Sequence, residues 1–238
     1  MERQYTFQDF AEIIKTLRSE NGCPWDREQT HESLKPCMTE EAAEMVASIR
    51  IYDKTGNAEN MREELGDILL QVMLHSCIAE EEGLFTLDDV IQEISEKMIR
   101  RHPHVFADEA ADTSVQVMKN WDEIKKKEKE GKDWIESPLR EIPKELPALV
   151  RAPKVLKKMD KLYEKGKTKE ELGNQMKETM SGLLLASEKK DIQAVSNHVS
   201  ELLWEVSDLS RIFKIPQEQV LTDCIEDHID RYEPETGR

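Results

Sequence analysis

The sequence predicts an all-α protein, and three observations support this prediction. Only nine of the 238 residues are glycine, and aromatic residues make up 5% of the chain. Glu, Lys, Leu and Met, which form helices readily, are abundant. Apolar residues recur at spacings of three and four along most of the chain, as they do when a helix buries one face. We therefore expect helices almost throughout, and no segment has a convincing strand pattern.

The first predicted helix spans about residues 7–21. Gly22 ends it, because glycine readily takes the left-handed conformation that follows many helices. Its buried side carries four apolar side chains, which are Phe10, Ile13, Ile14 and Leu17. A loop is expected at residues 23–26.

The next two helices should form an antiparallel hairpin. The first begins near residue 34 or 39 and ends at about Tyr52, and the second covers about residues 58–82. The segment between them, residues 54–57, reads Lys-Thr-Gly-Asn and has the composition of a turn. Residues on the two helices can therefore face one another.

A fourth helix should begin after Thr86 and end near Arg101. Two aspartates follow Thr86 closely, and these residue types are typical of the first turn of a helix. A proline comes directly after His102, and the residue before a proline disfavours the helical conformation. The segment that contains His102 and His104 is therefore expected to be a loop.

A proline-rich segment separates two predicted domains. It holds four of the nine prolines, Pro138, Pro143, Pro147 and Pro153, and is too interrupted for a long helix. We therefore expect a first domain at 1–130, a junction at 131–153 and a second domain at 154–238. Helical patterns resume beyond the junction at about 156–163, 169–187, 192–213 and 216–232.

The composition excludes some classes of partner. Lys and Arg total 34 against 50 Asp and Glu, and the net charge of -16 would repel nucleic acid. No stretch approaches the roughly 18 apolar residues of a membrane span, and the first ten residues lack the pattern of a secretion signal. The four cysteines form no C-x-x-C pair, which favours reduced thiols. We expect a cytoplasmic protein that binds neither nucleic acid nor membrane.

The most informative residues are two pairs of acids on the predicted hairpin. Glu41 and Glu44 are three residues apart on one helix, as are Glu64 and Asp67 on the next, so each pair lies on one helix face. Apolar residues at the same helical spacing, such as Ile49 eight residues after Glu41, place these acids beside the buried stripe, and Gly66 would allow close helix approach. Crowded carboxylates repel one another, and a hard cation such as Mg²⁺ removes that penalty.

Chance is the alternative explanation of these pairs. Charged residues make up 35% of the chain, so acids three apart also arise without a function, and a run such as residues 80–82 is typical of a solvated surface. The spacing alone does not decide between a metal site and a charged helix face.

The chain resembles the MazG family of nucleoside triphosphate pyrophosphohydrolases. The family signature is E-E-x-x-E on one helix and E-x-x-D on the next, and this chain has Glu40-Glu41-x-x-Glu44 and Glu64-x-x-Asp67. Further matching segments lie around it, at residues 21–26, 82–85, 100–108 and 121–125, so the resemblance covers most of residues 1–130. It implies a MazG-like helical bundle of two tandem domains, which a second copy of the chain completes as a homodimer.

The resemblance also implies roles for individual residues. The metal ligands would be Glu41, Glu44, Glu64 and Asp67, with Mg²⁺ as the cofactor and Mn²⁺ as a substitute. Glu40 and Glu63 are the candidate general bases. The choice between them is open, and the alternative is that one of the four ligands orients the water. Phosphate and base would be held by Lys97, Arg101, Trp121 and Lys125. Without the family, the two basic residues at helical spacing would be interpreted as a solvated helix end and the tryptophan as part of the core.

The implied reaction is Mg²⁺-dependent hydrolysis of a nucleoside triphosphate by attack of water at the α-phosphorus, which yields monophosphate and pyrophosphate. The substrates would be ordinary or non-canonical nucleotides. One alternative is a narrower pyrophosphohydrolase that acts on dUTP or a phosphoribosyl nucleotide. Another is a helical protein that binds a nucleotide or a partner without turnover.

A degenerate copy of the acidic signature lies in the second half of the chain. Residues 196–204 align with 62–70, and residues 177–186 align with 40–49. Glu178 then matches Glu41, but the positions of the other three ligands are occupied by Ser181, His198 and Glu201. Too few carboxylates remain for a magnesium site of the same design. We predict that the second domain is catalytically inactive and has a structural, dimer-forming or regulatory role.

Overall fold

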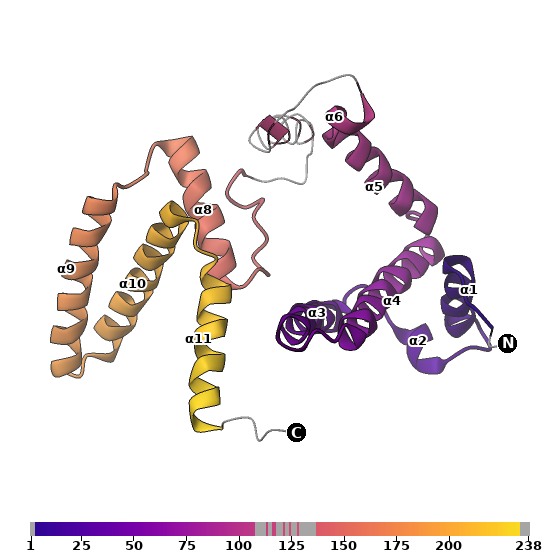
Figure 1. Cartoon of the computed structure of the whole chain (residues 1–238), viewed down its shortest axis with the longest axis horizontal. Helices are drawn as coiled ribbons and strands as arrows, with labels where there is room; N and C mark the ends of the chain where they lie inside the picture. The colour runs from indigo at the N-terminus through magenta and orange to yellow at the C-terminus, as the bar shows by residue number, and fades with distance from the viewer. Residues whose placement is uncertain are drawn as a thin grey trace. The chain divides into compact units, whose positions relative to one another are not determined.

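The computed structural model describes residues 3–107 and 137–233, together with residues 113, 116, 117, 121, 124 and 128. The regular elements within these residues are helices, with no strand among them, which confirms the predicted fold class (Figure 1). The chain divides into two compact units, Met1–Glu130 and Gly131–Arg238. Each unit is described by itself below.

The first helix ends because the chain turns back sharply on it. α1 (Phe7–Arg18) is three residues shorter than predicted. Beyond it, the backbone N–H of Cys23 donates a hydrogen bond of 2.7 Å to the carbonyl of Leu17. A Cβ atom at Gly22 would lie 2.2 Å from that same oxygen, so the turn requires glycine.

A short helix, α2 (Pro24–Glu28), occupies the place where a loop was predicted. Its first residue is a proline, which suits this position because the first N–H of a helix has no partner within it. Arg18 then joins three helices: it donates to the carbonyls of Asp26 and Gln29 and forms an ion pair of 2.7 Å with Glu81. Hydrogen bonds from Arg18 hold the pKa of Glu81 below its usual value.

The predicted hairpin is present as α3 (Lys35–Thr55) and α4 (Glu59–Glu81), which lie side by side (Figure 1). α3 runs three residues further than predicted, to Thr55, and Gly56 follows the helix in the left-handed conformation with a φ of 72°. The two ends of α4 lie within one residue of the prediction. This hairpin positions the acids.

α5 (Leu87–Arg101) begins at the predicted cap. The Thr86 hydroxyl accepts a hydrogen bond from the Asp89 N–H, and the Asp89 carboxylate accepts one from the Thr86 N–H. The loop prediction for the next segment was wrong, because α6 (Pro103–Phe106) forms a single helical turn there. The proline restricts the residue before it but is well suited to begin a new helix.

The core of the first unit lies where α1 crosses α4. Its buried members are Ile14, Leu34, Met73, Leu74, Cys77 and Ile78. Phe10 and Leu17 pack against this cluster as predicted, whereas the side chain of Ile13 is 40% exposed. The second half of α4 therefore packs in the core, whereas its first half, which carries the acids, packs beside α3.

The first helix of the second unit was predicted, but it begins earlier than expected. α8 (Ala148–Tyr163) starts eight residues before the expected position and contains Pro153 in its interior. A proline there leaves the carbonyl four residues earlier without its helical partner. That carbonyl belongs to Leu149, and the side-chain amide of Gln217 donates a hydrogen bond of 2.7 Å to it. A distant side chain thus replaces the missing backbone donor.

Three further helices complete the second unit. α9 (Lys169–Glu188) and α10 (Ile192–Phe213) pack against one another as a second hairpin, with bounds within one residue of those predicted (Figure 1). α11 (Gln217–Tyr232) follows and contacts α8. The hairpin is the counterpart of α3 and α4 in the sequence alignment of the two halves.

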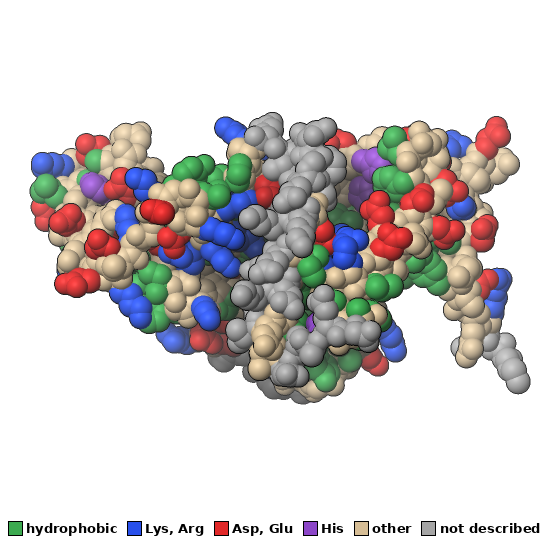
Figure 2. Space-filling model, turned by 90° about the horizontal axis from the view of Figure 1, so that it is seen from above, with side chains coloured by type: hydrophobic (Ala, Val, Ile, Leu, Met, Phe, Trp, Pro, Cys, Tyr) green, Lys and Arg blue, Asp and Glu red, His purple; other side chains and the backbone are tan. Residues whose placement is uncertain are grey.

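The described surface is mixed in charge. Figure 2 shows acidic side chains across the visible face of both units, with basic side chains between them. No helix in the described part of the chain combines the length and the apolar character that a membrane span requires.

Candidate metal centre

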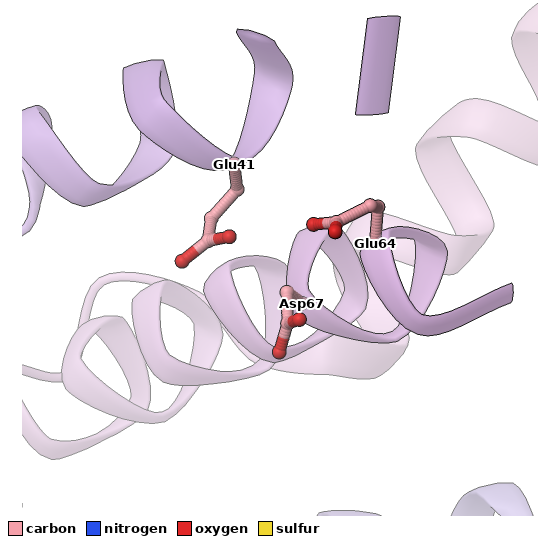
Figure 3. Close-up of side chains that lie close together, drawn as sticks. All are labelled: Glu41, Glu64 and Asp67. Carbon is pink, nitrogen blue, oxygen red and sulfur yellow. The ribbon is translucent and has the colours of Figure 1, made fainter. Parts of the chain in front are cut away.

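Three carboxylates converge between the two helices of the first hairpin. Glu41 comes from α3, whereas Glu64 and Asp67 come from α4, and each offers an oxygen within 4.8 Å of the others (Figure 3). The three-residue spacing on α4 places its two acids on the side that faces α3. Oxygen atoms from several carboxylates are the ligands that Mg²⁺ and Ca²⁺ take in proteins.

The electrostatics of the group favour a cation. Glu64 is buried, with 8% of its surface exposed, and Glu41 and Asp67 are half-buried. Burial raises the pKa of Glu41, and the charges of Asp67, Glu44, Glu64 and Glu40 raise it further. The donor set therefore fits a hard divalent cation, because such an ion would offset both the desolvation and the repulsion.

Three other predicted acids lie around this group rather than in it. Glu44 is exposed and is outside the set of oxygens within 4.8 Å, although its charge acts on Glu41. Glu40 and Glu63, the candidate general bases, are also exposed. The structure thus brings together three of the four predicted ligands.

The predicted phosphate-binding residues form a second cluster around the end of α5. The guanidinium of Arg101 lies 5.9 Å from the ring centre of Trp121, and the His102 ring meets that tryptophan edge-on at 5.0 Å. Lys97 is half-buried one turn before Arg101 on the same helix. Lys125 lies outside the described residues.

The sequence of this chain matches proteins of one family. The model of the MazG nucleotide pyrophosphohydrolase domain matches residues 29–106, which include both pairs of acids. The nucleoside triphosphate pyrophosphohydrolase/pyrophosphatase MazG of Thermotoga maritima is 37% identical over 226 residues, which cover 95% of this chain and 84% of that protein. The chain belongs to the MazG family. The resemblance seen in the acidic motifs is therefore confirmed.

Other MazG relatives share a shorter segment. The uncharacterised protein YabN of Bacillus subtilis is 51% identical over 153 residues, which are 64% of this chain and 30% of that protein. A nucleoside triphosphate pyrophosphohydrolase of Escherichia coli K12 is 44% identical over 147 residues, which are 61% of this chain and 54% of that protein. The matched part thus spans about a third and about half of these two relatives.

Two details of the MazG hairpin differ from the sequence prediction. A Cβ atom at Gly66 would meet no atom within 4 Å, so this glycine does not allow a close helix approach. It is exposed on α4, away from the helix contact. Ile49, expected on the buried stripe of α3, is 43% exposed, because α4 covers only one side of α3 in the single chain.

Asn60 is a site residue that the sequence reasoning missed. Its side-chain amide donates a hydrogen bond of 2.7 Å to a carboxylate oxygen of Glu64. The signal was an amide four residues before a predicted ligand, on the same face of the helix. This hydrogen bond restricts the rotation of the Glu64 carboxylate.

Replacing Asn60 with alanine should weaken divalent-cation binding by about tenfold, because partners of metal ligands commonly contribute this much. Calorimetric titration with Mn²⁺ measures the change. Gln92→Ala is the matched control, since Gln92 donates a similar hydrogen bond to Glu96 on α5, outside the acid group. Equal affinity of the Asn60 variant and the parent protein would remove this residue from the site.

Glu128 was also missed, because its partners are distant in sequence. It forms ion pairs with Arg100 at 2.8 Å and with Arg101 at 2.5 Å. Hydrogen bonds from Arg101, followed by those from Arg100, lower the pKa of Glu128 to about 2. The carboxylate therefore stays charged at any physiological pH and would compete with a phosphate for Arg101.

The change Glu128→Gln should strengthen the binding of inorganic pyrophosphate by about fivefold, since loss of one competing ion pair of about 1 kcal/mol gives this factor. Titration calorimetry compares this variant with Glu96→Gln, which neutralises an exposed acid on α5. Unchanged affinity in the Glu128 variant would argue against Arg101 as a phosphate ligand.

Proposed function

We propose that this protein hydrolyses nucleoside triphosphates to nucleoside monophosphate and pyrophosphate, with Mg²⁺ as the cofactor and water as the nucleophile at the α-phosphorus. The convergence of Glu41, Glu64 and Asp67 between α3 and α4 carries the proposal. Its context is a MazG-family chain whose relatives in Thermotoga maritima and Escherichia coli are named for this activity.

The metal would be held by the three converging carboxylates, with Glu44 as a fourth ligand from the next turn of α3. Mn²⁺ has the same preference for oxygen and would substitute for Mg²⁺. When bound, Mg²⁺ offsets charge on the triphosphate oxygens and lowers the pKa of water. Asn60 would hold the Glu64 carboxylate in a fixed orientation for this ion.

The remaining roles belong to side chains around the acids. Glu40 and Glu63 directly precede Glu41 and Glu64 in the chain and are exposed, and one of them would accept a proton from the attacking water. Lys97, Arg101 and Lys125 would neutralise the phosphates, and Trp121 would contact the base. These assignments rest on the family resemblance.

We further propose a homodimer. Large apolar side chains are exposed on α3 and α5 in the single chain: Val46, Ile49, Ile51, Tyr52, Ile91, Ile94 and Ile99. A second copy that packed on these helices would bury them and complete the bundle. The four cysteines are free thiols, which supports a reducing, cytoplasmic location.

The second unit would contribute no catalysis under this proposal. Among the described residues, the acids grouped closely enough for a metal ion are those of the first unit. In the α9–α10 hairpin, His198 lies 3.9 Å from Glu201, so a basic ring stands where the first hairpin has a carboxylate. A second divalent-cation site of the same design is therefore not expected there.

The test is incubation of the purified protein with each canonical triphosphate, with deaminated and oxidised triphosphates, and with dUTP, with and without Mg²⁺. Separating pyrophosphate from orthophosphate identifies the bond that breaks. Mg²⁺-dependent formation of pyrophosphate and monophosphate is the expected result. Turnover of dUTP alone would indicate the narrower enzyme, binding without turnover would indicate a nucleotide-binding protein, and orthophosphate release would contradict the proposed cleavage.

A further inference from the structure

The second unit contains a cavity of about 280 Å³ with an unusual lining. Leu156 and Leu172 supply apolar wall, and Trp204 supplies an aromatic ring. The buried acid Glu205 and two basic residues, Lys165 and Lys167, also line it. This combination of an aromatic ring, a buried acid and cations is typical of a pocket for a small polar ligand.

Glu205 is the buried group that lacks a complete set of partners. Only 2% of its surface is exposed. One carboxylate oxygen accepts a hydrogen bond of 2.8 Å from the Thr179 hydroxyl, whereas the other is buried with no hydrogen-bond partner in the described part of the chain. A buried carboxylate oxygen without a donor is costly, so a ligand that donates to it would be strongly favoured.

The other acid of the cavity has its charge balanced within the protein. Asp208 accepts hydrogen bonds from Arg211, which lies 2.7 Å away, and Arg211 also contacts Asp160 at 3.3 Å. Glu205 has no such cation among the described residues. Of the two acids that line the cavity with Trp204, Glu205 is therefore the one whose carboxylate lacks a hydrogen-bond donor.

The loop between α8 and α9 supplies the opposite charge. Lys165 is exposed on this loop and forms no ion pair with another described residue. Lys167 is exposed two residues later and donates a hydrogen bond to the side chain of Gln175. The intervening Gly166 packs closely on the end of α8: a Cβ atom there would lie 2.2 Å from the Asp160 carboxylate. Close packing at Gly166 fixes the loop and keeps both lysines at the cavity.

We propose that this cavity binds a guanine mononucleotide. The base stacks on Trp204 and donates its ring N1–H and its exocyclic amino group to Glu205, and the phosphate pairs with Lys165 and Lys167. Guanine is the base whose pairing edge presents two adjacent N–H donors, the arrangement that matches a carboxylate. The cavity is close to the lower end of the range of about 300–1,000 Å³ for small-molecule pockets, which suits a monophosphate. The site is independent of the proposed hydrolysis and of its metal.

Calorimetry of the full chain in EDTA with GMP tests the site, because EDTA excludes metal-dependent binding at the acids of the first unit. One GMP per chain is expected. Lys165→Ala and Glu205→Gln should each weaken binding by about tenfold or more, the usual contribution of a charge-assisted hydrogen bond. Lys189→Ala is the matched control, since this exposed lysine ends α9, about 30 Å of helix away from the lysine loop.

Guanosine, inorganic phosphate, AMP and UMP separate the contributions of base and phosphate. Weaker binding of all four than of GMP supports the proposal. Equal binding of inorganic phosphate would reduce the site to an anion site, and equal binding of AMP or UMP would remove the selection of guanine by its two adjacent donors; each of these results overturns the proposal. So does GMP binding that is absent, or that both pocket variants leave unchanged. Circular dichroism checks folding, and Lys165→Ala, in an exposed loop, keeps the test decisive should Glu205→Gln unfold.

Discussion

Changing Asp67 to asparagine should lower the rate of pyrophosphate release at least about a thousandfold while helical content stays near that of the parent protein. Asparagine has the shape of aspartate, so the packing between α3 and α4 is kept. The change removes one charge and one strong oxygen ligand from a group of three carboxylates. Transition-state stabilisation of several kcal/mol by a bound cation depends on those ligands.

The measurement is steady-state pyrophosphate release over a range of Mg²⁺ concentrations. Glu59→Gln is the matched control, because Glu59 is an exposed acid on the same helix, outside the group. It should retain turnover within about twofold of the parent protein. An Asp67→Asn protein that turns over at the parent rate would show that the reaction occurs elsewhere in the chain.

Local periodicity explains why the acid group could be predicted from the sequence. Glu64 and Asp67 share a face of α4 through the helical repeat alone, and a short turn at Gly56 makes α3 pack beside them. Glu44 has the same spacing from Glu41 but is exposed and lies outside the set of oxygens within 4.8 Å of one another. Spacing predicts which residues share a face, whereas the rotation of each helix about its axis depends on the whole core.

Features that depend on distant partners could not be predicted in this way. From the sequence, Pro153 was expected to interrupt a helix, but in α8 the side-chain amide of Gln217 replaces the N–H donor that the proline lacks. From the sequence, Arg101 was predicted to bind phosphate, but in the structure it forms an ion pair with Glu128. In both cases a side chain far along the sequence interacts with the local motif and alters the structure or role that the motif predicts. No residue near the motif indicates which side chain that is.

In the second half of the chain, too, local features could be predicted from the sequence and features formed by distant residues could not. The bounds of α9 and α10 followed from their apolar repeat. The cavity beside Trp204 did not follow, because its lining comes from α8, the next loop, α9 and α10. The loss of the acidic signature predicted that this hairpin has no metal site like that of the first unit. The cavity became apparent only from the packing of the helices and the loop around Trp204.

The acid group should also make the protein less stable without metal and more stable with it. The pKa of Glu41 is raised by burial and by the surrounding acids, so its charged form is less favourable in the folded chain than in the unfolded one. At neutral pH this charge destabilises the fold, and stability is regained as pH falls through the raised pKa. Glu41→Gln should therefore raise the melting temperature in EDTA by a few degrees.

Mg²⁺ should stabilise the parent protein much more than it stabilises this variant. At a hundredfold excess over its Kd, the ion should stabilise the parent by about 2.7 kcal/mol, or roughly 5–10 °C for a chain of this size. The Glu41→Gln variant should lose most of this response, and so should the parent as pH falls and Glu41 is protonated. Thermal unfolding in EDTA and in Mg²⁺ measures both effects, with Glu59→Gln as the control. A Glu41→Gln protein that melts lower than the parent in EDTA would show that the carboxylate stabilises the metal-free fold, and repulsion would then no longer be an argument for a cation site.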